Sequence, residues 1–289
     1  MSASKVVQRV PATEIREGAG VTVHRTIGTA TCRHLDPFLL FDHFASDDPD
    51  DYAAGFPDHP HRGFITLTYM LDGHMRHRDS MGNQGELRGG GAQWMKAASG
   101  IIHSEMPRQS QGAMRGFQLW INLPAREKMA PPEYQELSPQ SIPTVDGGGA
   151  RVRLLSGRHA GSEGPIADPH TDLFYADIAL TPGTCFTAQP GVRRSAFVYC
   201  FEGAVWVSGQ KVGVRELGVL GEGELLELAA DRDGARLLLV AGTPLREPIV
   251  QQGPFVMNTR EEIEQALADY RSNALVRHRP TGAGGSGSG

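Results

Sequence analysis

The 36 glycines and 19 prolines of this 289-residue chain constrain its fold more than any other feature, because they divide it into short segments. Helices tolerate such a content poorly, whereas β architectures need it at their turns. The segments between the turns are rich in β-branched and aromatic residues, which is typical of strands. The clearest are residues 64–71 (FITLTYML), 116–123 (GFQLWINL), 173–180 (LFYADIAL) and 196–201 (AFVYCF). The sequence therefore predicts an all-β protein made of barrels or sandwiches.

Two of these segments end alike, which indicates a repeated architecture. Residues 64–71 run into Asp72-Gly73 and residues 196–201 into Glu202-Gly203, and we interpret both endings as hairpin turns. The stretch between the halves is rich in proline and glycine, as expected of a crossing between domains. We predict two tandem jelly-roll-like β-barrels. The expected divisions are an N-terminal domain 1–123, a linker 124–150, a C-terminal domain 151–245, an extension 246–281 and a Gly/Ser-rich, linker-like tail 282–289.

One helix is predicted in the extension. Thr259 with Glu262 three residues later forms a capping-box pattern. The apolar residues that follow recur at helical spacing and share one face, which predicts a helix packed against a barrel. They are Ile263, Ala266, Leu267 and Tyr270.

Composition excludes several classes of function. The formal net charge is −5 and there is no lysine or arginine block, so direct nucleic-acid binding is not indicated. No apolar run approaches the roughly 20 residues that cross a bilayer, and the first residues lack the apolar core of a signal peptide. Cys32, Cys185 and Cys200 have no CxxC spacing, and we interpret them as reduced, buried thiols. We expect a cytoplasmic monomer.

Two short motifs place candidate metal ligands on strands. His59 and His61 are two residues apart, and so are His103 and Glu105. Side chains at i and i+2 of a strand point to the same face, so two such strands inside a barrel would bring four ligands together. Imidazole and carboxylate suit Fe(II), Mn(II), Ni(II), Cu(II) or Zn(II), and the lack of thiolate argues against a closed structural zinc site. The alternative is two polar strands at a solvated barrel mouth.

The residues around these motifs resemble the pirin family of the cupin superfamily. The resemblance is carried by residues 56–64 (FPDHPHRGF) and 100–107 (GIIHSEMP), with support from residues 34–44 (HLDPFLLFDHF) and 253–259 (GPFVMNT). It extends from about residue 20 to about residue 275. It implies two tandem cupin barrels, with a metal in the N-terminal barrel and none in the C-terminal one.

The resemblance also implies a ligand set and an activity. The family's four ligands fall on His59, His61, His103 and Glu105, whereas Thr66 stands near the position of a glutamate ligand in the broader cupin pattern. The expected cofactor is one divalent transition metal, Fe(II) first, with Mn, Ni, Cu, Zn and Co as alternatives. The expected activity is that of a quercetin 2,3-dioxygenase, which opens the flavonol ring with O2 and releases CO, with Glu105 as the acceptor of the substrate's hydroxyl proton.

Several further residues have more than one possible role. An apolar slot for a small planar phenol or flavonol could be lined by Phe56, Phe64, Trp94, Met106 and Trp120, although ordinary core packing is the alternative for each. Arg62 follows a ligand directly, so strand alternation turns it away from the metal, and we expect it to form an ion pair outside the barrel. Asp42 and His43 could orient a ligand or form structural hydrogen bonds.

The motifs alone do not choose between two classes of function. One is the metal-dependent dioxygenase, with quercetin or another enediol or phenol as substrate. The other is an iron-dependent redox-sensing interaction protein or transcriptional co-regulator without turnover, which would bind a protein partner. The same ligands serve both.

Overall fold

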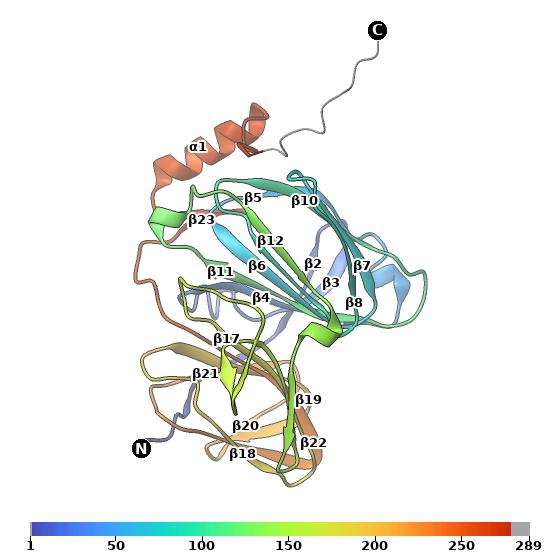
Figure 1. Ribbon diagram of the computed structural model, residues 1–289, viewed down its shortest axis with the longest axis vertical. Helices are drawn as coiled ribbons and strands as arrows, with labels where there is room; N and C mark the ends of the chain where they lie inside the picture. The colour runs from blue at the N-terminus through green and yellow to red at the C-terminus, as the bar shows by residue number, and fades with distance from the viewer. Residues whose placement is uncertain (1, 279–289) are drawn as a thin grey trace.

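The computed structural model describes residues 2–278, and its strands form two β-barrels packed against each other, with one α-helix outside them (Figure 1). The predicted fold of two tandem barrels with a C-terminal helix is therefore confirmed. The tail 282–289 lies outside the described residues. None of the helices within residues 2–278 has the length and apolar character required to cross a membrane.

The N-terminal barrel consists of two antiparallel sheets. The larger sheet has seven strands, which in spatial order are β12 (Glu133–Leu137), β9 (Ala92–Lys96), β6 (Phe64–Asp72), β11 (Met114–Asn122), β4 (Phe38–Ser46), β3 (Val21–Arg25) and β2 (Thr13–Glu17). The smaller sheet has four, which are β5 (Phe56–His61), β10 (Ile101–Pro107), β7 (His74–Asp79) and β8 (Gln84–Arg88).

The C-terminal barrel is one nine-stranded sheet. Its main path runs β1 (Val6–Pro11), β21 (Glu216–Leu220), β19 (Ser195–Val207), β22 (Leu226–Gly242), β17 (Phe174–Leu180), β14 (Ala150–Ser156) and β13 (Thr144–Gly147). Two further strands pair off this path, β18 (Cys185–Ala188) on β22 and β20 (Gln210–Val212) on β19. Short hairpins are formed by β15 (Arg158–His159) with β16 (Ser162–Glu163) and by β23 (Val250–Gln252) with β24 (Phe255–Met257).

Several strands pair outside the domain that the sequence suggested for them. Within 1–123, β1 pairs with β21 of the C-terminal sheet. Residues 124–150, predicted as a linker, supply a strand to each large sheet: β12 pairs with β9, and β13 pairs with β14. The local sequence marks a strand, but the free sheet edge that it completes is set by distant parts of the chain.

The two glycine turns are not hairpins, which corrects our prediction. Gly73 has a φ of +97° and turns the chain from β6 in the large sheet into β7 in the small one, and β6 pairs with β9 and β11. Gly203 has a φ of +67° and lies at irregularities within the single long strand β19. Both glycines adopt left-handed backbone, as turn residues do, but the sequence cannot show which strand the chain pairs with after the bend.

Alternation along the central strands separates two cores. One face of each large sheet contributes to a shared apolar cluster between the barrels, which includes Phe41, Leu67, Phe117, Tyr199 and Leu238. The opposite face points into each barrel. In the C-terminal barrel this interior is a large apolar cluster, with Val198, Leu237 and Leu239 among its residues. The N-terminal interior is apolar only in part, around Phe44, Met70 and Met114.

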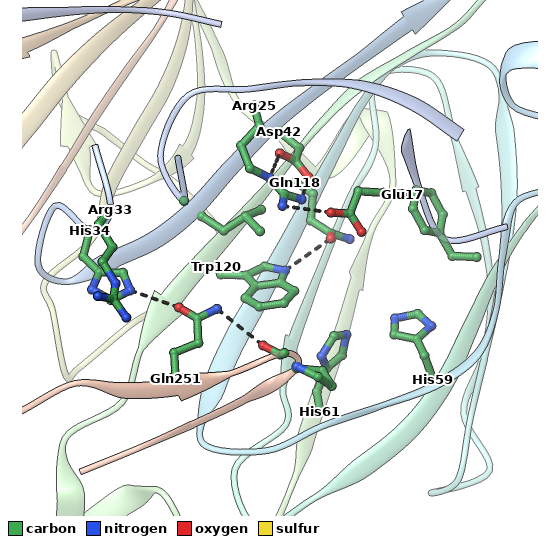
Figure 2. A pocket seen from close by; sticks show the side chains of 15 residues that line it. Glu17, Arg25, Arg33, His34, Asp42, His59, His61, Gln118, Trp120 and Gln251 are labelled. Atoms are coloured by element: carbon green, nitrogen blue, oxygen red, sulfur yellow. Dashed lines mark hydrogen bonds and ion pairs between the residues drawn. The ribbon is translucent and has the colours of Figure 1, made fainter. Parts of the chain in front are cut away.

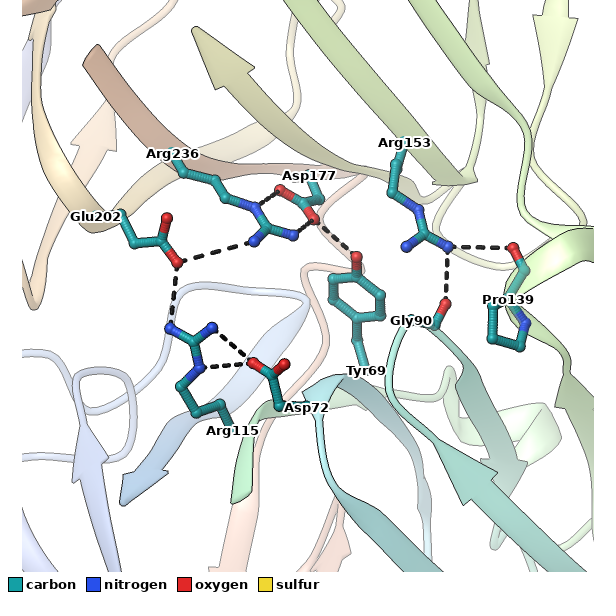
Figure 3. Close-up of polar contacts among 9 residues, drawn as sticks. All are labelled: Tyr69, Asp72, Gly90, Arg115, Pro139, Arg153, Asp177, Glu202 and Arg236. Carbon is teal, nitrogen blue, oxygen red and sulfur yellow. Dashed lines mark hydrogen bonds and ion pairs between the residues drawn. The ribbon is translucent and has the colours of Figure 1, made fainter. Parts of the chain in front are cut away.

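Polar contacts also join the barrels (Figure 3). The Tyr69 hydroxyl donates to Asp177 Oδ2 at 2.7 Å, and Arg236 donates to both oxygens of the same carboxylate. Arg115 contacts Glu202 at 3.3 Å across the junction. Because Asp177 is only 2% exposed, these partners satisfy a carboxylate that would otherwise be buried alone.

The predicted helix is α1 (Arg260–Arg271), and it begins as expected. Thr259 and Glu262 form a complete capping box, and Ile263 and Ala266 are buried against the β23–β24 hairpin. Tyr270 is 40% exposed at the margin of this contact. Figure 1 shows α1 at the outer end of the N-terminal barrel, away from the C-terminal barrel.

The three cysteines are free thiols, but only two are buried. Cys32 and Cys200 lie in apolar clusters, as predicted. Cys185 on β18 is exposed, so the prediction of a buried side chain was wrong for this residue. Strand β18 pairs with β22 beside the main path of the sheet, and alternation turns Cys185 outward while Ala188 is buried.

Candidate metal centre

Three imidazoles meet where β5 and β10 pair inside the N-terminal barrel. In the antiparallel register His103 lies opposite His59, and Ile101 lies opposite His61. The ring centroids of the three histidines are 4.3–4.9 Å apart. One nitrogen from each ring lies within 4.8 Å of the others, so His59, His61 and His103 could hold a metal ion together. The same-face arrangement that i and i+2 spacing predicts is present.

Hydrogen bonds orient two of these rings. His59 Nδ1 lies 2.8 Å from the Pro57 carbonyl oxygen, to which it can only donate. His103 Nδ1 lies 3.4 Å from His77 Nδ1, and His77 Nε2 lies 3.2 Å from Asp79 Oδ2. If His77 donates to Asp79, its Nδ1 accepts the proton of His103 Nδ1. Both His59 and His103 then keep a free lone pair on Nε2, the arrangement expected of oriented metal ligands.

Two of the three imidazoles, those of His61 and His103, are kept neutral by their surroundings. Burial, together with the neighbouring His59, holds the pKa of His61 well below its ordinary value. Burial and the imidazoles of His61, His59 and His77 do the same to the pKa of His103. His61 Nδ1 and His103 Nε2 are buried without any hydrogen-bond partner in the described structure. Burying a nitrogen without a hydrogen-bond partner costs folding free energy. A neutral imidazole is also the form that binds a metal.

Glu105 brings a negative charge to this region without a basic partner among residues 2–278. Its side chain is buried, with Oε1 accepting from Thr68 Oγ1 at 3.2 Å and Oε2 from Gln118 Nε2 at 3.0 Å. The group of atoms within 4.8 Å of one another does not include its carboxylate. A register shift in the β5–β10 pairing falls between His103 and Glu105. A buried carboxylate held by uncharged donors beside three imidazoles favours a bound cation, so the donor set fits a divalent metal.

A cavity of about 460 Å³ opens beside the histidines (Figure 2). His59 and His61 form part of its wall, and Phe56, Gln118 and Trp120 form another part. Trp120 Nε1 donates to Gln118 Oε1 at 3.2 Å, which turns the Gln118 amide nitrogen towards Glu105. The remaining lining is mostly polar and includes Glu17, Arg25, Arg33, His34, Asp42 and Gln251.

The five predicted slot residues have different environments. Phe56 and Trp120 line the cavity. Phe64 is fully buried behind them, with its ring centroid 4.3 Å from that of Trp120 and 5.1 Å from that of His61. Trp94 lies in the core between the barrels, and Met106 lies on β10 next to Gly55. Neither of these last two lines the cavity.

The C-terminal extension binds Arg62, the residue that follows His61. The ion pair predicted for Arg62 is confirmed: its Nη1 lies 2.8 Å from Asp269 Oδ2 on α1, and its Nε donates to the Ser99 carbonyl. The Arg62 backbone N–H donates to the Pro254 carbonyl, and Val256 N–H donates to the Arg62 carbonyl. The sequence did not predict that the Arg62 guanidinium would be buried, as it is in the structure.

Asp42 and His43 have structural partners, one of the two possibilities that the sequence left open. Asp42 forms a two-point ion pair with Arg25, with contacts of 2.7 and 2.6 Å. His43 Nδ1 lies 3.0 Å from the Tyr199 hydroxyl at the junction of the barrels. Burial lowers the pKa of His43 to about 3, so this ring is neutral at ordinary pH.

Sequence reasoning did not assign roles to the residues that support the ligands. His77 and Asp79 orient His103, and Thr68 and Gln118 hold Glu105. A signal existed for Gln118, because it shares the i and i+2 spacing of the ligand motifs with the predicted pocket residue Trp120 on a predicted strand. The pairing of β7 with β10, which places His77 opposite Glu105 and beside His103, has no local signature.

Comparison with known proteins gives consistent matches over nearly the whole chain. Residues 20–121 match the family model described as Pirin, and residues 175–276 match the Pirin C-terminal cupin domain. A Pseudomonas aeruginosa protein provisionally named as a quercetin 2,3-dioxygenase is 49% identical, with 90% of this chain and 94% of that protein covered. Human pirin is 42% identical, with 94% of this chain and 93% of pirin covered. The crystal structure of quercetin 2,3-dioxygenase from Acinetobacter baumannii superposes with a TM-score of 0.88 at 31% identity, covering 95% of this chain and 99% of that one.

Proposed function

The chain belongs to the pirin family, and from that premise we propose that it is a metal-dependent dioxygenase of planar phenols, with quercetin as substrate. The reaction would consume one O2, break the C2–C3 and C3–C4 bonds of the central flavonol ring and release C3 with its oxygen as CO, while both atoms of O2 are incorporated into the ester product. The names of the Pseudomonas aeruginosa and Acinetobacter baumannii relatives support this choice. The observation that carries it is the cluster of three histidines and the buried Glu105 carboxylate beside a cavity of about 460 Å³.

We propose that His59, His61 and His103 hold the metal and that Glu105 is the fourth ligand. Fe(II) is the proposed ion, and Mn, Ni, Cu, Zn and Co suit the same donors to varying degrees. A bound divalent ion would supply Lewis acidity that lowers the pKa of a substrate hydroxyl. The Asp79–His77 contact keeps the lone pair of His103 Nε2 available for such an ion.

The cavity walls would bind and orient the substrate. A volume of about 460 Å³ lies within the range of small-molecule sites. The indole of Trp120 and the ring of Phe56 offer apolar faces for a flat aromatic ring. Gln118 holds one oxygen of Glu105, and Thr68 holds the other. We propose that the Glu105 carboxylate accepts the proton of the flavonol 3-hydroxyl, a step that requires an acceptor within hydrogen-bond reach.

One experiment tests the activity directly. Purified protein is loaded with Fe(II), quercetin is added, and loss of flavonol absorbance is followed together with O2 uptake and CO release. Equal consumption of quercetin and O2, abolished by a chelator, is expected. Glu105→Gln should keep part of its metal and lose turnover by a factor of about 100 or more, as for loss of a general base. Fully loaded protein that leaves quercetin and related flavonols unchanged would refute the dioxygenase and favour a role in protein interaction.

A further inference from the structure

Two arginines line the cavity beside the histidines, and only one of them has its charge neutralised. Arg25 donates to both oxygens of Asp42, and its Nη1 lies 2.8 Å from Glu17 Oε1. Two carboxylates thus surround one guanidinium at that part of the wall. Any anion entering there would meet a surplus of negative charge.

Arg33 is the other arginine, and within residues 2–278 its guanidinium forms neither an ion pair nor a side-chain hydrogen bond. It lines the cavity and is exposed to solvent. Its neighbour His34 is fixed, because His34 Nε2 lies 3.0 Å from Gln251 Oε1. Figure 2 shows Arg33 and His34 on one side of Trp120 and His59 on the other. The cavity therefore has a candidate metal site at one end and a free cation at the other.

The loop that carries Arg33 is held on both sides. The Cys32 carbonyl accepts from the N–H groups of Gly28 and Thr29, and the Cys32 side chain is buried. Leu35 and Phe38 exchange backbone hydrogen bonds beyond it. The guanidinium thus extends from a fixed backbone, which limits the entropy lost when it binds a ligand. A planar fork with five N–H donors matches a carboxylate better than it matches a neutral hydroxyl.

We propose that Arg33 is a substrate-specificity residue, and that the preferred substrate is a flat aromatic acid whose anionic group binds Arg33. Its hydroxyl end then faces His59 and His61, and its ring lies along Trp120. This inference rests on the proposed function for the hydroxyl end, and it narrows the substrate class from neutral flavonols to phenols that carry a carboxylate remote from the metal-binding oxygens.

The test measures binding without turnover. Protein loaded with Zn(II), which has no redox chemistry, is titrated with 3-hydroxyflavone and with its 4′-carboxylate and 7-carboxylate, and Kd is obtained by calorimetry at constant ionic strength. At least one carboxylate should bind about 10-fold more tightly than the neutral flavone, as expected for one charge-assisted contact. Arg33→Gln should remove that advantage, so that neither carboxylate binds more tightly than neutral 3-hydroxyflavone to this variant.

Arg260→Gln is the matched control, because Arg260 is a highly exposed arginine on α1 and does not line the cavity. It changes the net charge equally and should keep the preference for the carboxylate probe.

Equal binding of the three probes to the wild type would overturn the inference, and so would a preference for a carboxylate that survives Arg33→Gln. If quercetin is turned over but neither carboxylate binds more tightly than the neutral flavone, the dioxygenase is supported and the proposed role of Arg33 is refuted. An Arg33-dependent preference in a protein without turnover would support the subsite and count against the dioxygenase.

Discussion

Gln118 and Trp120 on β11 line the cavity of the N-terminal barrel, whereas Leu237 and Leu239 on β22 fill the interior of the C-terminal barrel. Both strands are central in their sheets, and both follow the same alternation, with the intervening residues Leu119 and Leu238 in the shared core. The same strand architecture thus presents hydrogen-bonding groups in one barrel and hydrocarbon in the other.

The difference shows how a duplicated fold can divide its tasks. An apolar interior offers no hydrogen-bond donor or acceptor that could orient a metal ligand. The C-terminal barrel instead contributes apolar burial, both in its own interior and in the cluster between the barrels. The N-terminal barrel accepts buried polar groups because each supports another, as Trp120 supports Gln118 and Gln118 supports Glu105. Three predictions break or sharpen this comparison.

The largest effect is expected when the C-terminal interior is made polar. Leu239→Gln places an amide where the surroundings are apolar and fully buried, and should lower the free energy of unfolding by about 3–5 kcal/mol. Thr68→Val makes the reverse change in the N-terminal interior and removes the 3.2 Å hydrogen bond to Glu105 and a 3.5 Å one from Gln118, so about 1–2 kcal/mol is expected. Urea denaturation of both variants measures the contrast, and equal losses would contradict it.

A smaller effect is expected at the ion pair between Arg62, which directly follows strand β5, and Asp269 on α1. Asp269→Ala leaves the buried guanidinium of Arg62 without its carboxylate and should cost about 3 kcal/mol of unfolding free energy. Glu264→Ala on the same helix removes an exposed pair with Arg260 and should cost less than about 0.5 kcal/mol. If thermal or urea unfolding does not separate the two variants, Arg62 does not depend on Asp269.

The smallest effect concerns His43 between the barrels. Its folded pKa of about 3 lies below the ordinary 6.5, so only the unfolded chain takes up this proton as the pH falls below 6.5. Stability from this residue is complete above pH 6.5, and about 2 kcal/mol should be lost by pH 5. His43→Gln should show a shallower loss between these pH values, measured by urea denaturation in excess chelator. Parallel pH profiles for the two proteins would show that His43 is not the group responsible.

Much of the N-terminal site could be predicted from sequence, because strand geometry makes i and i+2 residues share a face. This spacing predicts that His59 and His61 lie on one face of a strand, and that His103 and Glu105 lie on one face of another. The capping box at Thr259 and Glu262 was likewise a local signal and is present in the structure. Gly73 and Gly203 both have the positive φ of turn residues, but the hairpins predicted at these two positions were wrong.

The rest depends on contacts between distant segments. Arg62 reaches Asp269, His77 reaches His103, and β1 completes the edge of a sheet more than 200 residues away along the chain. No periodicity or turn signal encodes such pairings, since each strand could serve any free edge. Trp94 illustrates the same limit: its aromatic side chain suits a pocket or a core equally, and only the packing of the barrels places it in the core.

The central claim is that the polar interior of the N-terminal barrel holds a metal ion through its three histidines. The most direct test is the metal content per chain, measured by mass spectrometry after Fe(II) loading and desalting under nitrogen. Wild-type protein should keep about one ion per chain, and His103→Ala should keep almost none. His159→Ala, in the C-terminal barrel, should match the wild type. Metal-free wild type, or full metal content in His103→Ala, would contradict the account.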